Sequence, residues 1–137
     1  MAAIRPPLPE PLPAEIAERV AIFDRLLNFA DVEPYQAVEE TWTPLRAILV
    51  EIYEQTGRSL PMPGFKVIDM VTQIAEDGIV EPRWVDVAYP LYYWAGEQTP
   101  ETLATNPGHA KTDILLAKAL AAGLLLTTKP YEDRKRS

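Results

Sequence analysis

Apolar side chains recur every three or four positions along most of this chain, which is the spacing of one face of an α-helix. No stretch shows sustained alternation with period two or an Asn-Gly hairpin signal, so the pattern predicts no β-strand. We therefore expect an all-α fold, a compact bundle of five to six helices. The predicted helices cover residues 14–29, 34–56, 65–75, 82–95 and 109–127, with a single turn near 99–103.

Two prolines interrupt this pattern. Thr43-Pro44 combines a good N-cap with a residue that is favoured at the first helical position, so 34–56 forms either one kinked helix or two helices. Pro90 falls inside a later helix, where proline costs about 3 kcal/mol. We expect a kink near Tyr89 or an early stop there.

The two ends of the chain differ in composition from the middle. Residues 1–13 form a proline-rich extended arm, because prolines 6, 7, 9, 11 and 13 fix φ and remove backbone donors. This arm is either a stiff leader lying along the bundle or a ligand for an aromatic proline-binding groove. Residues 14–128 form a single helical domain of ordinary size, and 129–137 form a basic tail.

Charge and composition exclude several kinds of function. Thirteen Lys and Arg against twenty Asp and Glu give a net charge of −7, which predicts no DNA partner and disfavours RNA. The absence of cysteine and the single histidine exclude thiolate and multi-histidine metal sites, and Glu51 with Glu54 indicates a solvated helix face. We therefore predict no metal and no cofactor. Without an apolar run of about 18 residues or a signal peptide, the chain is expected to be cytoplasmic, with no membrane contact.

The order of signals from Thr43 onward resembles a known family. A helix that begins Leu-Arg, at 45–51, ends near a glycine. A later helix ends in the apolar-acidic-Gly-Ile pattern at 71–79. A loop with His109 then precedes an apolar last helix. Over about 43–127 this order is similar to the HEPN-like helical domains of prokaryotes, some of which accompany defence modules. The resemblance implies a metal-independent RNase site across a dimer, built from an arginine, a polar residue and a histidine.

The chain departs from that family at the arginine. Its expected position falls among residues 102–106, where the sequence has none. Attack by a 2′-hydroxyl needs a cation to hold the phosphate as well as a base, so the resemblance implies a degenerate, non-catalytic member. Asn106, His109 and Lys111 are the candidates for an atypical catalytic site, although a histidine at a helix entry is more typical of a structural residue.

Two apolar features favour binding over catalysis. Aromatic side chains crowd the helix around Pro90, where they either fill a core that is short of phenylalanine or face a groove or a partner. The last helix is apolar nearly all round, so it is buried by its neighbours or by another chain. The predicted interface residues are Tyr89, Tyr93, Trp94, Leu116, Leu120 and Leu124.

The leading hypothesis is thus a non-catalytic interaction or regulatory module that contacts another protein or itself, as a dimer, in a prokaryotic defence or mobile-element setting. One alternative is a HEPN-like RNase with the atypical site. Another is a phage or mobile-element protein that is structural or inhibits a nucleic-acid-binding target by charge mimicry.

Overall fold

The fold is an all-α bundle, as the apolar pattern predicts. The computed structural model describes residues 12–57, 66–97 and 107–127, and these ranges hold five helices and no strand. The proline-rich arm up to residue 11, the predicted turn at 99–103 and the basic tail lie outside the described residues. The helices are α1 (Ala14–Phe29), α2 (Pro34–Gln55), α3 (Val67–Glu76), α4 (Arg83–Glu97) and α6 (Pro107–Thr127).

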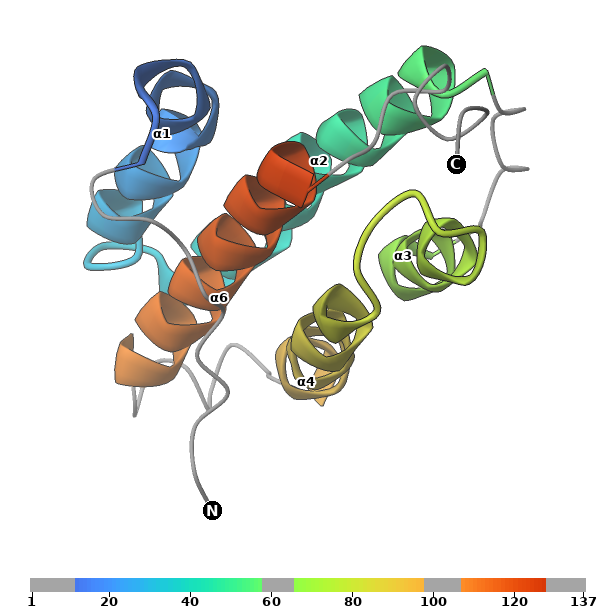
Figure 1. Cartoon of the computed structure of the whole chain (residues 1–137). Coiled ribbons are helices and arrows are strands. Elements are labelled where there is room, and N and C mark those ends of the chain that lie inside the picture. Colours follow the sequence, from blue (N-terminus) through green and yellow to red (C-terminus); the bar gives the residue numbers. More distant parts are fainter. Residues whose placement is uncertain (1–11, 58–65, 98–106, 128–137) are drawn as a thin grey trace.

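The last helix lies at the centre of the bundle. α6 packs against α1, α2 and α4, and α3 packs against α2 and α4 (Figure 1). Among the described residues α6 supplies eight fully buried side chains, all but one of them apolar. The uniform apolar character of this helix is therefore explained by its neighbours within the chain. None of the described helices is both long and apolar enough to cross a membrane.

Both internal prolines lie within continuous helices. α2 runs unbroken through Pro44, so 34–56 holds one helix rather than two. Pro44 lacks the N–H that would bond the carbonyl of Glu40, but Glu40 lies on the exposed side, where water can satisfy that oxygen. α4 likewise continues past Pro90 to Glu97, so the alternative of an early stop near Tyr89 was wrong.

Glycine ends two of the helices. Gly57 follows α2 with φ 71° and Gly78 follows α3 with φ 75°, both in the left-handed region. Because L side chains rarely adopt this conformation, glycine is the usual residue at this place. Gly57 and Gly78 thus provide the left-handed residue that ends each helix.

A close contact joins α4 to α6 at Gly123. Trp84 is 1% exposed, and its indole ring lies directly on Gly123 of α6. A Cβ built on Gly123 would stand 2.0 Å from Cη2 of Trp84, so this position accepts no side chain while the ring stays in place. The missing side chain of Gly123 therefore lets an aromatic ring of α4 come close to the α6 backbone.

Candidate functional site

The first turns of α6 carry two of the three catalytic candidates. His109 is exposed in the first turn, whereas Asn106 lies outside the described residues. Lys111 lies about one turn after the start of α6, and its Nζ forms an ion pair with Oδ1 of Asp31 in the α1–α2 connection. The Lys111 charge is therefore already balanced by a carboxylate of this chain.

A buried carboxylate, Asp113, lies next to this histidine. Asp113 is 3% exposed and follows His109 by four residues, so the two share one side of α6. Within the described part of the chain, no group donates a hydrogen bond to Oδ2 of Asp113. Burial raises the pKa of Asp113 to about 6, and the positive charge of His109 acts in the opposite direction.

His109 and Asp113 are four residues apart on α6, so an imidazole and a carboxylate lie on one side of the helix. A nearby carboxylate is the usual group that orients a histidine base. The sequence pattern did not reveal Asp113, although one signal pointed to it. Asp113 is an acidic residue within an otherwise apolar stripe of α6, and it follows the single histidine by four residues, which is one helical turn. A pair of this kind lacks the cation that phosphate chemistry needs, and the nearest upstream arginine, Arg83, pairs with Glu81 at 2.5 Å.

The predicted interface residues fall into three groups in the structure. Tyr89 is 49% exposed on α4, and Leu116 is partly buried. Leu120 and Leu124 are completely buried within the chain, so in this structure neither of them offers surface to a partner. The physical reason is the central position of α6, which gives these leucines neighbours on the other helices. Tyr93 and Trp94 belong to α4, but their side chains lie outside the described part.

One side of α6 is apolar and is exposed to solvent at Leu115. Residues 115, 119, 122 and 126 follow each other at spacings of four, three and four, so they form one stripe along the helix. We call Leu115, Ala119, Ala122 and Leu126 the outer stripe of α6. Leu115 is 52% exposed, which makes it one of three large hydrophobic residues that are exposed in the described part.

Two ion pairs with α1 flank Leu115 along the helix. Lys111 pairs with Asp31 on one side, and Nζ of Lys118 donates to Oδ1 of Asp24 at 2.8 Å on the other. The order of the pairs shows that α1 and α6 run antiparallel. Exposed pairs of this kind contribute about 0–1 kcal/mol each, so their main effect is to hold the two helices in one register.

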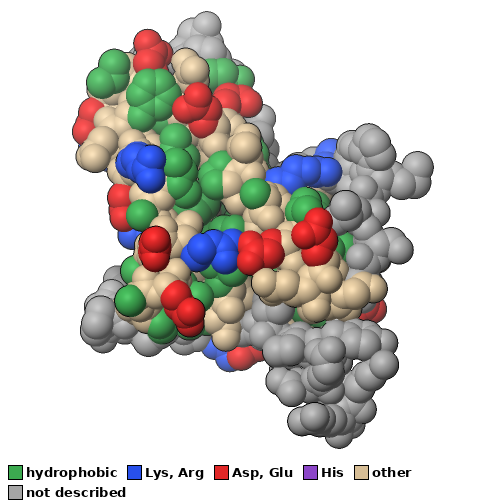
Figure 2. Space-filling model, turned by 90° about the horizontal axis from the view of Figure 1, so that it is seen from above, with side chains coloured by type: hydrophobic (Ala, Val, Ile, Leu, Met, Phe, Trp, Pro, Cys, Tyr) green, Lys and Arg blue, Asp and Glu red, His purple; other side chains and the backbone are tan. Residues whose placement is uncertain are grey.

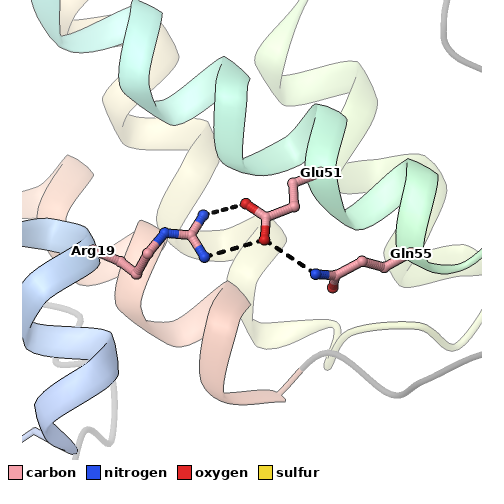
Figure 3. Close-up of polar contacts among 3 residues, drawn as sticks. All are labelled: Arg19, Glu51 and Gln55. Carbon is pink, nitrogen blue, oxygen red and sulfur yellow. Dashed lines mark hydrogen bonds and ion pairs between the residues drawn. The ribbon is translucent and has the colours of Figure 1, made fainter.

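A third polar contact holds α1 against α2. The Arg19 guanidinium bonds both carboxylate oxygens of Glu51, with Nη1 at 3.1 Å from Oε1, and Gln55 donates to the same Oε1 at 3.0 Å (Figure 3). Glu51 is therefore occupied by donors of this chain and is not paired with Glu54 around a cation. No group of three or more His, Asp or Glu that could hold a metal occurs in the described ranges.

Acidic side chains do not gather on the face shown in Figure 2. Asp and Glu side chains there are interspersed with Lys, Arg and hydrophobic ones. A protein that mimics nucleic acid would concentrate its carboxylates on one surface. This face therefore lends no support to charge mimicry.

The fold defines a small helical-bundle protein whose central helix exposes one large apolar side chain, Leu115. Comparison with known proteins finds no matching family model, no matching curated protein and no matching solved structure. The HEPN-like resemblance stays a prediction from the sequence. Function must therefore be inferred from the geometry of this chain alone.

Proposed function

We propose that this chain is a non-catalytic helical module that binds a partner protein through the outer stripe of α6. The observation that carries the proposal is Leu115, a leucine that is 52% exposed on a helix whose other described leucines and isoleucine are buried or partly buried. A large apolar side chain loses favourable free energy when it stays in water, about 25 cal/mol for each Å² of apolar surface. Covering Leu115 with a partner recovers that free energy.

The surroundings of Leu115 resemble the anatomy of a protein-binding site. Such sites commonly have an apolar anchor at the centre and a polar rim around it. Here the rim consists of the Lys111–Asp31 and Lys118–Asp24 pairs, whose charges are already balanced within the chain. Because the ion pairs also hold α1 in register with α6, the anchor is presented on a rigid surface, which lowers the entropic cost of binding.

Replacing Leu115 with aspartate is expected to abolish capture of the partner. The full-length tagged chain would be captured from its own cells after nuclease treatment, and co-purifying proteins would be quantified by mass spectrometry. A hot-spot residue contributes about 2 kcal/mol or more, so the bound fraction should fall by roughly thirtyfold at limiting partner.

The matched control is Tyr89→Asp, which places the same charge at an exposed apolar position on α4. If Tyr89→Asp loses the partner and Leu115→Asp keeps it, the binding surface is on α4 and the assignment to α6 is wrong. If the only specific co-purifying species is the untagged chain, the partner is a second copy.

RNA cleavage remains a second candidate because the exposed His109 lies near the carboxylate of Asp113. In that function His109 would be the base, so His109→Ala should lower cleavage of single-stranded RNA by about 10²-fold or more. The assay uses purified chain with a ribonuclease inhibitor control for contaminants. Equal cleavage by His109→Ala and the parent, or none by the parent, would remove this candidate.

A further inference from the structure

The two ion pairs between α6 and the α1 side of the bundle mark the corners of a rectangle on the surface. On α6, Lys111 and Lys118 lie seven residues apart, which is about 10 Å along the helix axis. Their partners, Asp31 and Asp24, lie just after α1 and on it. Because the two helices are antiparallel (Figure 1), α6 supplies both positive corners and the α1 side supplies both negative ones. We call these four side chains the charged frame.

The side chains of the charged frame keep exposed surface although they are paired within the chain. The side chains of Asp31 and Asp24 are 58% and 54% exposed, and those of Lys111 and Lys118 are 43% and 29% exposed. An ammonium group has three donors and a carboxylate has about four acceptor sites, so each can take a second partner. The charged frame can therefore bind further groups of opposite charge.

Two of the three large hydrophobic residues that are exposed in the described part lie within or beside the charged frame. Leu115 lies between Lys111 and Lys118 on α6, and Val32, which is 75% exposed, directly follows Asp31. The third, Tyr89, is on α4. Apolar surface and charges of both signs thus occur together on the side of the bundle formed by α1 and α6.

We propose that the charged frame and Leu115 bind a second copy of this chain, related to the first by a two-fold axis that runs between α1 and α6 and parallel to both. The rotation lays α6 of each copy over α1 of the other, so four antiparallel helices meet at the contact. This inference rests on the function proposed above, because it names the protein that covers the outer stripe of α6.

The charges select this axis. In the proposed dimer Lys111 faces the second copy's Asp31, and Lys118 faces the second copy's Asp24, so all four contacts across the axis are attractive. A two-fold axis that ran across the helices would instead place Lys111 over the second copy's Lys118, and these charges repel. Complementarity of this kind fixes the register of two surfaces and disfavours other arrangements.

The same rotation brings leucines together at the centre of the charged frame. Leu115 follows Lys111 by four residues and Leu27 precedes Asp31 by four, so the two leucines lie level on the antiparallel helices. The axis is parallel to the helices and keeps this level, so Leu115 of one copy lies over Leu27 of the other, which is itself partly buried. Removing Leu115 from water is the apolar contribution to binding.

The size of this face predicts a weak dimer. α1 has 16 residues and is about 24 Å long, and two packed helices are about 20 Å wide, so the face covers on the order of 500 Å² in each copy. A total near 1,000 Å² is at the low end of specific interfaces, as in transient complexes. The net charge of −7 on each copy also opposes association. The dimer should therefore form at micromolar or higher concentration of the chain.

The test is sedimentation velocity of the purified full-length chain between about 10 and about 500 μM, the range in which a weak dimer dissociates. Lys118→Glu places a carboxylate opposite the second copy's Asp24, at two symmetry-related places. Asp24→Lys places a lysine opposite the second copy's Lys118 in the same way. Each variant alone should have a dissociation constant at least about tenfold higher than the parent.

A mixture of the two variants distinguishes contact between copies from an effect within one chain. In a mixed dimer Glu at position 118 faces Lys at position 24, and Lys118 faces Asp24, so all these contacts are attractive again. We therefore expect an equimolar mixture of Lys118→Glu and Asp24→Lys to associate nearly as strongly as the parent. A change that only disturbs each folded chain is not reversed by mixing.

Arg83→Glu is the matched control, because it makes the same change of charge on α4, away from the charged frame. This variant should associate like the parent. Circular dichroism confirms that each variant keeps its helices. A parent chain that is monomeric at about 500 μM would overturn the proposal. Association of a single variant that equals that of the parent, or a mixture no stronger than its components, would also overturn it.

The two proposals fail in different ways. If the parent stays monomeric but Leu115→Asp still loses a captured protein, the outer stripe binds a different protein and only the second copy is excluded. If the mixture associates as expected but Leu115→Asp keeps every captured protein, including the untagged chain, the charged frame holds a second copy and the proposed role of Leu115 is wrong. If both proposals hold, Leu115→Asp should weaken the dimer, and Tyr89→Asp should leave it unchanged.

Discussion

Replacing Gly123 with alanine should destabilise the protein by about 3 kcal/mol, the upper end of the range for overpacked cores. Helix propensity alone predicts the opposite, since alanine is favoured over glycine by about 1 kcal/mol in a helix interior. Packing reverses the sign because the new Cβ would stand 2.0 to 2.4 Å from three atoms of the Trp84 ring. Urea unfolding followed by circular dichroism measures the difference.

The contact with Trp84 can be isolated by a double-mutant cycle. Phenylalanine at position 84 has a shorter ring, so Trp84→Phe should relieve part of the clash in the Gly123→Ala background. Nε1 of Trp84 is buried and has no acceptor in the described part, so this change removes no hydrogen bond seen there. Additive effects of the two substitutions would show that the contact is not the cause of the destabilisation.

Replacing Asp113 with asparagine should stabilise the protein at pH 7.5 and have little effect near pH 4. The folded-state pKa of Asp113 is raised to about 6 by burial, against an ordinary value of about 3.9 in the unfolded chain. Between these values the folded state binds more protons than the unfolded state, so stability falls as the pH rises through them. Above pH 7 the raised pKa of Asp113 lowers the free energy of unfolding of the parent protein by an amount on the order of 3 kcal/mol.

The measurement is urea unfolding of the parent and Asp113→Asn at several values of pH between 4 and 8. The stability gained by Asp113→Asn at high pH should be smaller than the loss that the raised pKa causes, because the new amide also needs hydrogen-bond partners in a buried place. Glu54→Gln, at an exposed carboxylate of α2, is the matched control and should change stability by less than about 0.5 kcal/mol at every pH. A gain at Asp113→Asn that is the same at pH 4 and pH 7.5 would contradict the burial of a charged group.

The helices themselves were largely predictable. The boundaries of α1 agree with the apolar spacing of 14–29, and the stop at Gly57 follows from the need for a left-handed residue. The prolines were harder to interpret, because a Thr-Pro pair has the same local preference at a helix start and at an exposed place within a helix. In α2 the buried stripe continues on both sides of Pro44, and its packing outweighs the missing hydrogen bond.

The candidate site was only partly predictable. Sequence spacing found His109 and Lys111, but it could not show that Lys111 is paired with Asp31, which is distant in the chain. It also selected Leu120 and Leu124 as interface residues and did not select Leu115. In a helix that is apolar nearly all round, periodicity does not tell which side faces the core, because every side satisfies the pattern.

The sequence by itself determined the all-α class, the position of most helices and the apolar nature of the last one, because these depend on local preferences and on spacing along the chain. Only the tertiary structure decided that α6 is central, that Trp84 rests on Gly123, and that Asp113 is buried while Leu115 is exposed. These features depend on which helices meet and at what register. That choice is made by packing between residues far apart in the chain, which no local pattern contains.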